Sequence, residues 1–544
     1  MGDSFLNNVF TARLLILEWG LFLVCLFFVP AVSAFSRRSI APTRYMWVGI
    51  VIIPMFLAWF IFYFGNRQFG GWDFSILIDT GWRQILGQRP YTNFITPNPP
   101  GFNLGVFYAF RIFGVMWNAQ IYAAIFFCVA SFLWMYWLLR KLSSSPLIAL
   151  FLAFAVECVT FVPLCFWWYN DVTSVLASVF LLSSIVYAHR DGRGDTISYR
   201  QAVWWSYVLS LALLCLMKPN IAGLLIVFAT VLLFFAVRSK VQMMVGTAIG
   251  GVLFLAILWL NHISLPDMIA SYRAAAIERG GLKDFGLYTY THLQRVLLLL
   301  WTLVFAIPLV TLLPRLLSAW RQKRWHDFAF LLLLLSALPV TFYGMWTNGE
   351  IKDSETSVLI VSCGILCLVL RQTNLWIRTL FVAIIISMLG GDIYYGVARE
   401  RVRGIGPGQF YEATGADRPI RDEFFSSLVS TPYFEDVQRE VRKASTLFPG
   451  PVFLGPRLEF EYAVLRIPSP AGWPVYYQPG TSFASRDLLR VDGIWKATGF
   501  QTLIFLGKDR TFYPPDLLEF IESNYERQPG FSDVEVYRRR HQTS

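Results

Sequence analysis

The chain has 544 residues, of which 56% are hydrophobic and only 15% are charged. Soluble domains carry about 25% charged residues, so this composition excludes an ordinary soluble protein and indicates one embedded in a membrane. The net charge of +11 does not indicate a nucleic-acid partner, because the cations form short clusters between apolar stretches and no continuous basic face.

Apolar stretches long enough to cross a bilayer recur along the chain, since a spanning helix needs about 20 mainly apolar residues. The predicted spans are 14–35, 46–64, 118–139, 145–163, 171–188, 200–217, 220–237, 241–260, 293–313, 326–344, 356–370 and 376–395. The first is not expected to be a cleaved signal peptide, because it contains Glu18 and ends at Arg37 and Arg38, where a signal peptide would have small residues.

Lysine and arginine are concentrated in every second loop between these spans. They follow spans one, three, five, seven, nine and eleven, and short basic loops of this kind face the cytoplasm. The extracytoplasmic side then receives segments 65–117, 167–171, 218–220, 261–292, 345–355 and the chain beyond 396. This alternation requires that the apolar segment 101–116 does not cross. We predict there an amphipathic helix lying along the interface after Pro99 and Pro100.

The last part of the chain, 396–544, has a different character, with more charge, more Pro and Gly, and no long apolar run. Residues 452–454 and 502–506 are predicted to be buried strands, and 515–525 a helix. We therefore predict an α-helical polytopic membrane protein. It has about twelve transmembrane helices in a domain 1–395, and a small C-terminal α/β extracytoplasmic domain at 396–544.

In the first long extracytoplasmic loop, 65–117, Asp73 stands just where the chain leaves the second span. A carboxylate at the membrane surface can remove a proton from an acceptor hydroxyl, and partial desolvation would increase its basicity. The alternative interpretation is structural, with Asp73 as the N-cap of the helix that follows it. The two roles are compatible.

This loop resembles the first luminal loop of the GT-C glycosyltransferases, most closely in bacterial members related to protein mannosyltransferases and to aminoarabinose transferases. The resemblance covers roughly thirty residues in a pattern recognised by its spacing. In this sequence the matching residues are Asp73, Gly87, Pro90, Tyr91, Phe94, Pro99, Pro100 and Gly101. It implies an enzyme that takes a sugar from a polyprenyl-phosphate carrier and inverts the anomeric centre, with Asp73 as the general base.

One position departs from the family pattern. Many members have a second acidic residue directly after the loop Asp, whereas Phe74 stands there in this sequence. Asp79 is the second candidate for the base, although six residues along a helix place it on a different face from Asp73. Asp79 also stands four residues before Arg83, and this spacing predicts an ion pair.

Basic residues on the predicted outer side are candidates for binding the donor phosphate. Lys218 lies where span six meets that side, and the resemblance suggests phosphate contact there. The alternative is a lysine that snorkels to the headgroups. Arg273, Arg279 and Lys283 make loop 261–292 basic against the topological trend, although an amphipathic helix lying on lipid also explains them.

Three further groups are candidates for binding the sugar or acceptor. Trp168, Tyr169 and Asp171 combine ring faces with a carboxylate, with an aromatic belt and a helix N-cap as the alternative. Asn98 belongs to the first loop, and Glu350 and Asp353 lie in a densely polar turn. We expect no metal and no cofactor, because the carboxylates show no convincing ligand spacing and the seven cysteines lie in or beside apolar stretches.

The sequence thus predicts a glycosyltransferase of the bacterial inner membrane with its active site outside the cytoplasm. Its expected partners are a polyprenyl-phosphate sugar, membrane lipid, and a glycan, lipid or protein acceptor. A transporter or flippase of a lipid-linked sugar is one alternative, although ionisable residues deep in the spans are few. A lipid-linked-glycan ligase or polymerase using His262 and His292 is another, and a non-catalytic scaffold is a third.

Overall fold

The structure is a computed structural model. It describes residues 20–24, 45–67, 69, 72–143, 145–162, 165–191, 197–279, 294–348, 356–370, 375–402, 418–420, 422–480, 482–507 and 509–540. The chain divides into two compact units. The first comprises 1–62, 124–257 and 281–398, and the second comprises 63–123, 258–280 and 399–544.

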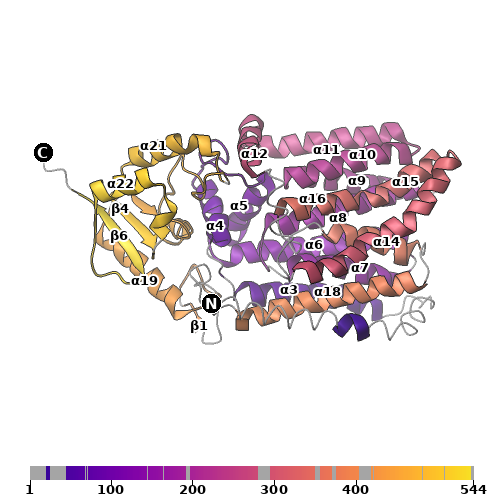
Figure 1. The fold of residues 1–544 in the computed structure, drawn as a ribbon, viewed down its shortest axis with the longest axis horizontal. Coiled ribbons are helices and arrows are strands. Elements are labelled where there is room, and N and C mark those ends of the chain that lie inside the picture. Colours follow the sequence, from indigo (N-terminus) through magenta and orange to yellow (C-terminus); the bar gives the residue numbers. More distant parts are fainter. Residues whose placement is uncertain are drawn as a thin grey trace. The chain divides into compact units, whose positions relative to one another are not determined.

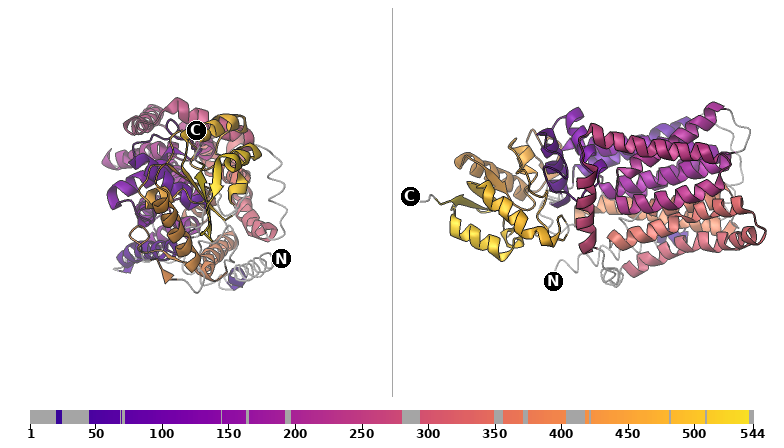
Figure 2. Two further views of the ribbon diagram at one scale, coloured as in Figure 1. Left: turned by 90° about the vertical axis from the view of Figure 1, so that its left-hand side faces the viewer. Right: turned by 90° about the horizontal axis from the view of Figure 1, so that it is seen from above.

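The first unit is built from apolar helices of different lengths that run side by side (Figures 1 and 2). They are α3 (Tyr45–Gly65), α6 (Asn118–Leu142), α7 (Pro146–Phe161), α8 (Tyr169–Arg190), α9 (Ile197–Cys215), α10 (Pro219–Ala236), α11 (Lys240–Leu260), α14 (Gln294–Arg321), α15 (Trp325–Leu335), α16 (Ala337–Asn348), α17 (Thr356–Gly364) with the π-turn η1 (Ile365–Val369), and α18 (Leu375–Val402). Every span predicted from 46–64 onward is therefore helical. The predicted span at 14–35 lies largely outside the described residues, of which 20–24 are helical.

Five of these helices, α3, α6, α8, α10 and α11, are long and apolar enough to cross a membrane. Shorter apolar helices cover much of the other predicted spans. The chain is accordingly a mostly helical protein with membrane-spanning helices, and the count of about twelve spans stays a prediction.

Helix α8 lies at the centre of the first unit, with all of its residues from Asn170 to Ala188 buried. It packs against α7, α9, α10 and α17. Small residues permit this close approach, and several of their hydroxyl groups form hydrogen bonds to carbonyl groups of the same helix. For example, the hydroxyl of Ser178 donates to the carbonyl of Ser174 at 2.8 Å, and that of Ser184 donates to Phe180 at 2.9 Å.

The second unit combines α4 (Trp72–Ile85), α5 (Pro100–Phe113) and α12 (Leu265–Arg279) with the C-terminal segment. It therefore collects three segments that the charge pattern assigns to the same side of the membrane. Helix α5 begins directly after Pro99, as predicted. It packs closely on α4 at Gly81, where a Cβ atom would come within 2.9 Å of the Phe110 ring.

The C-terminal segment contains a four-stranded mixed sheet of order β3-β4-β6-β5, drawn in yellow in Figure 1. Its strands are β3 (Val452–Leu454), β4 (Thr502–Leu506), β5 (Tyr525–Arg527) and β6 (Val534–Arg539), and a separate pair joins β1 (Arg418–Pro419) to β2 (Val429–Ser430). The helical elements are α19 (Pro432–Leu447), α20 (Glu461–Val464), η2 (Ser485–Asp487), α21 (Leu488–Thr498), η3 (Asp509–Phe512) and α22 (Pro515–Asn524). The two predicted strands are confirmed, and the predicted helix at 515–525 is α22.

Aromatic residues form the core beside this sheet. Phe453 of β3 packs edge-on against Trp473 and Trp495, with ring centroids 5.6 and 5.4 Å apart. Strand β4 is an inner strand, paired in parallel with β3 on one edge and in antiparallel fashion with β6 on the other, and its side chains are buried along its whole length. A continuous apolar run such as 502–506 is typical of a strand with both faces covered.

Candidate functional site

Helix α4 places Asp73 at an exposed position directly before a buried stretch of the same helix. Asp73 is the second residue of the helix and is exposed, whereas every residue from 74 to 84 is buried. The helix begins at Trp72, so Asp73 lies inside the first turn and not at the N-cap. A negative charge is favoured there by the partial positive charge of the helix N-terminus. Burial of residues 74–84 fixes the backbone that carries this carboxylate.

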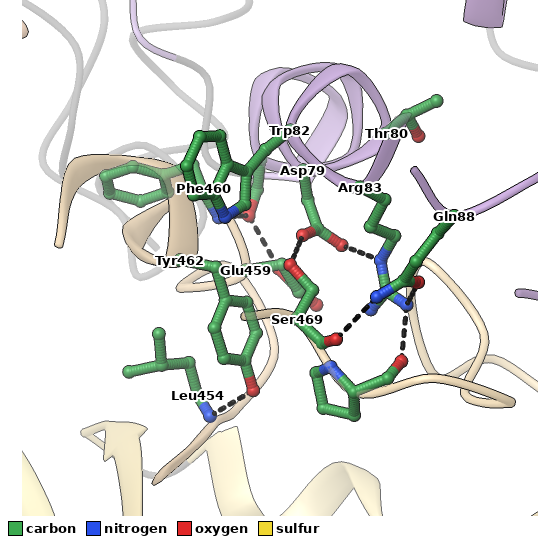
Figure 3. A network of polar contacts seen from close by, with 12 residues as sticks. Asp79, Thr80, Trp82, Arg83, Gln88, Leu454, Glu459, Phe460, Tyr462 and Ser469 are labelled. Atoms are coloured by element: carbon green, nitrogen blue, oxygen red, sulfur yellow. Dashed lines mark hydrogen bonds and ion pairs between the residues drawn. The ribbon is translucent and has the colours of Figure 1, made fainter. Parts of the chain in front are cut away.

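Asp79 lies on the same helix in a completely different environment (Figure 3). Its side chain is fully buried, and its Oδ2 forms an ion pair with Nε of Arg83 at 2.6 Å. Its Oδ1 accepts a hydrogen bond from the hydroxyl of Ser469, also at 2.6 Å. The predicted pairing of Asp79 with Arg83 is therefore confirmed. Burial raises the pKa of Asp79, against the lowering effect of Arg83 and of the Ser469 hydrogen bond.

Arg83 also connects α4 to residues 467–470, which precede α21 in the chain. Its Nη1 donates to the carbonyl of Pro470 at 2.6 Å, and the amide of Gln88 donates to the carbonyl of Ser469 at 2.8 Å. Trp82 extends the contact by donating from Nε1 to the carbonyl of Ile467 at 2.8 Å. Residues 467–470 thus line one face of α4, and the Asp79 carboxylate on that face is fully committed to structural contacts.

Glu459 is a second carboxyl group beside α4, and the sequence offered no signal for it. The hydroxyl of Ser75 donates to Oε2 of Glu459 at 2.6 Å, and the backbone N–H of Phe460 donates to the same hydroxyl at 3.1 Å. Burial raises the pKa of Glu459 to about 8, opposed by the Ser75 hydrogen bond. The residue lies 384 positions from Ser75, so local spacing cannot reveal the contact.

Asn98 belongs to a buried polar cluster between the first loop and α12. Its carbonyl accepts a hydrogen bond from the Tyr91 hydroxyl, which also lies 3.4 Å from the hydroxyl of Tyr272 on α12. Ser271 of α12 donates to the carbonyl of Thr96 at 2.7 Å. The structure therefore brings α12, the described helix of the predicted loop 261–292, onto the first loop within the second unit.

The structure describes two of the three basic residues that were predicted in loop 261–292 to bind phosphate. Arg273 follows Tyr272 on α12 and is exposed. Arg279 is the last residue of the same helix. Lys283 lies outside the described residues, as do Glu350 and Asp353.

In the first unit, Lys218 lies beside the aromatic motif at the start of α8. It occupies the N-cap position of α10, and its Nζ lies 3.2 Å from Oδ1 of Asn170 and 5.8 Å from the ring centroid of Tyr169. The backbone N–H of Lys218 contacts the hydroxyl of Thr173 at 3.3 Å. Lys218 and the aromatic motif at the start of α8 thus form one cluster, although Lys218 and Asn170 are 48 residues apart in the sequence.

The remaining members of that motif are buried. Trp168 is 8% exposed and Asp171 is 5% exposed. Helix α8 begins at Tyr169, so Asp171 lies in its first turn and the alternative interpretation as an N-cap is wrong. Within the described parts of the chain, no group of three or more His, Cys, Asp or Glu side chains is arranged to hold a metal ion.

Comparison with known proteins gives matches in structure alone: no protein-family model and no curated protein sequence matches the chain. ArnT from Cupriavidus metallidurans bound to undecaprenyl phosphate is similar at a TM-score of 0.54 and 12% identity, over 92% of this chain and 99% of that chain. The apo state of the same ArnT is similar at 0.52 and 13% identity, over 90% and 98%. The oligosaccharyltransferase of Archaeoglobus fulgidus is similar at 0.44 and 12% identity, over 92% and 74%.

The match to ArnT extends over nearly the whole of both chains, so it concerns the complete fold and not one shared motif. At 12–13% identity it establishes the fold alone. The likeness that the first loop suggested is thereby confirmed at this level, and the chain has the fold of the GT-C glycosyltransferases.

Proposed function

We propose that this protein is an inverting membrane glycosyltransferase that moves a sugar from a polyprenyl-phosphate donor to an extracytoplasmic acceptor, with Asp73 as the general base. The observation that carries the proposal is the exposed carboxylate of Asp73 at the start of a buried helix. The GT-C fold supports it, because the ArnT with that fold was crystallised with undecaprenyl phosphate.

Asp73 is preferred to Asp79 as the base because of accessibility. A base must come within hydrogen-bonding distance of the proton it removes. Asp79 is fully buried and is held by Arg83 and Ser469, whereas Asp73 is exposed. In the proposed step, Asp73 takes the proton of the acceptor hydroxyl as the hydroxyl oxygen attacks the anomeric carbon. The bond from that carbon to the phosphate oxygen breaks on the opposite face, which inverts the centre and releases polyprenyl phosphate.

Lys218 is the proposed contact for the donor phosphate. A lysine is a compact positive charge that compensates the charge developing on a leaving phosphate. Asn170 and Tyr169 hold its Nζ in a defined position, which favours a binding role over a mobile headgroup contact. Arg273, exposed on α12, is a second proposed contact.

We place the second unit on the extracytoplasmic face of a bacterial plasma membrane. Its three segments, 63–123, 258–280 and 399–544, overlap the parts of the chain that the basic loops assign to that face. Their packing into one compact unit supports this orientation.

The direct test replaces Asp73 by Asn and measures release of free undecaprenyl phosphate from undecaprenyl-phosphate monosaccharides, in membranes that contain the protein. Asp516→Asn is a matched control, because Asp516 is also an exposed second residue of a helix, α22, in the same unit. Loss of a general base is expected to slow turnover roughly 100- to 10,000-fold, with binding of undecaprenyl phosphate retained. Retained turnover in Asp73→Asn would eliminate the base assignment, and translocation without release would identify a flippase.

A further inference from the structure

We propose that Glu459 is a positioning residue for Asp73, which holds the first turns of α4 through Ser75 and does so as a neutral carboxylic acid. The inference rests on the proposed role of Asp73. The inference adds a residue of the C-terminal segment that acts on Asp73 through α4 and not by contact with the substrate.

The contact is made two residues beyond Asp73. Ser75 is fully buried, and its hydroxyl accepts the N–H of Phe460 at 3.1 Å while lying 2.6 Å from Oε2 of Glu459. A serine hydroxyl has a single proton, so the bond to Glu459 uses that proton. The two hydrogen bonds fix the Ser75 side chain, and with it the helical turn that carries Asp73.

Charged neighbours surround Glu459 but are paired with one another. Asp79 of α4 is paired with Arg83. Asp509 binds Arg457 through two hydrogen bonds of 2.6 Å, and this pair is also buried. Tyr462 and Tyr513 face Glu459 as well, and its charge would raise the pKa of each.

This environment disfavours a negative charge on Glu459. Burial raises its pKa, and the carboxylates of Asp79 and Asp509 raise it further, to about 8. The side chain is therefore predominantly protonated at pH 7. Above about pH 8 it would become a buried anion beside two other carboxylates, with a neutral hydroxyl as its hydrogen-bond partner. The Ser75 hydrogen bond favours the anion, but burial and the two neighbouring carboxylates outweigh it. Ionisation therefore favours an opened site in which the Glu459 carboxylate reaches water, and this opening displaces α4 and Asp73 with it.

The rival interpretations make different predictions. If Glu459 only filled space in the core, its substitution would lower the stability of the protein. It would not lower kcat selectively while leaving KM unchanged. If it acted as an ionised base, a neutral substitute would abolish activity. A positioning acid requires the neutral hydrogen-bonding form and fails when ionised.

The test uses the full-length protein with Glu459→Gln, Glu459→Ala and Ser75→Ala. Glu461→Gln is the matched control, because Glu461 is a buried carboxyl group of similarly raised pKa, about 8, that bonds Gln438 on α19 instead of α4. Turnover of an undecaprenyl-phosphate monosaccharide is measured from pH 6 to 9.5. Hydrogen exchange of the α4 amides is measured at pH 7 and at pH 9, as protection relative to the intrinsic rate.

As the pH rises, we expect kcat of the wild-type protein to fall with an apparent pKa near 8. The protection of the α4 amides against hydrogen exchange should fall over the same pH range. Glu459→Gln should remove both losses, because its amide oxygen still accepts the Ser75 proton and cannot ionise. Glu459→Ala and Ser75→Ala should lower kcat roughly ten- to hundredfold at every pH with little change in KM, since misplacing a catalytic group affects the chemical step. The control should keep the wild-type profile.

Several outcomes would overturn the inference. They are an alkaline fall that persists in Glu459→Gln, α4 protection that does not change between pH 7 and 9, and loss of activity at pH 7 in Glu459→Gln. Failure of the base assignment is recognised separately. Turnover retained in Asp73→Asn would refute that assignment, whereas the exchange measurement tests the Glu459 contact without reference to turnover.

Discussion

Ser469 donates a 2.6 Å hydrogen bond to the carboxylate of Asp79, although 390 residues separate them in the chain. The same carboxylate pairs with Arg83, so the buried charge on α4 is satisfied partly by its own helix and partly by the C-terminal segment. This arrangement identifies Asp79 as a residue that holds the second unit together, and it leaves the exposed Asp73 as the proposed base.

Removing the Asp79 charge should destabilise the protein strongly. Asp79→Asn leaves the guanidinium of Arg83 buried without a counter-charge, and breaking a buried pair in this way costs about 3–5 kcal/mol. Thermal unfolding in detergent measures the effect. Asp436→Asn is the control, because the pair of Asp436 with Arg439 is exposed and such pairs contribute about 0–1 kcal/mol. Equal destabilisation by the two variants would contradict the structural role of Asp79.

Replacing Lys218 should weaken binding of the lipid phosphate. Lys218→Met removes the positive charge held beside Asn170, and a hydrogen bond to a charged group is worth about 1.5–3 kcal/mol. Affinity for undecaprenyl phosphate should therefore fall roughly ten- to hundredfold. Lys240→Met is a close control, because Lys240 begins α11 and also lies near an aromatic ring, that of Phe234. Unchanged affinity in Lys218→Met would exclude the proposed contact.

A methyl group at position 81 should disturb the packing of α5 on α4. In Gly81→Ala the new Cβ would lie 2.9 Å from the Phe110 ring and 3.0 Å from a methyl of Val106, so both neighbours must move. Overpacking of this kind costs about 1–3 kcal/mol, visible as a lower unfolding midpoint. Gly493→Ala in α21 should instead be neutral or stabilising by up to about 1 kcal/mol, since its Cβ would meet nothing within 4 Å. Destabilisation confined to Gly493→Ala would contradict this description.

Stability should decline as the pH rises toward 8. Burial raises the pKa of Glu459 and of Glu461 to about 8, whereas glutamate in an unfolded chain titrates near about 4.3. Because the folded state binds these protons more tightly, the stability they contribute is complete below the unfolded value and is lost as the pH passes through the folded value. The unfolding midpoint should therefore fall between about pH 5 and pH 8. The double variant Glu459→Gln/Glu461→Gln should show a flatter profile, and an unchanged slope would count against buried neutral acids.

Local patterns in the sequence predicted much of the architecture. Runs of apolar residues marked the helices α3, α6–α11 and α14–α18, because a helix that contacts lipid or lies buried must be apolar over a length set by the bilayer. The four-residue spacing of Asp79 and Arg83 predicted their pairing, since such residues are neighbours on any helix. The buried strands β3 and β4 were recognisable for a similar reason, as short apolar runs between turn residues.

The partners of these elements depended on tertiary structure. Nothing near Ser75 or Asp79 indicates Glu459 or Ser469, because contacts between distant segments leave no periodic trace in one sequence. The sequence by itself predicted a short helix at Asp73, directly after an apolar stretch, and the structure has that helix as α4. Only the folded chain decided that Asp73 is exposed while Asp79 is buried, since burial depends on which distant residues pack against each face of α4.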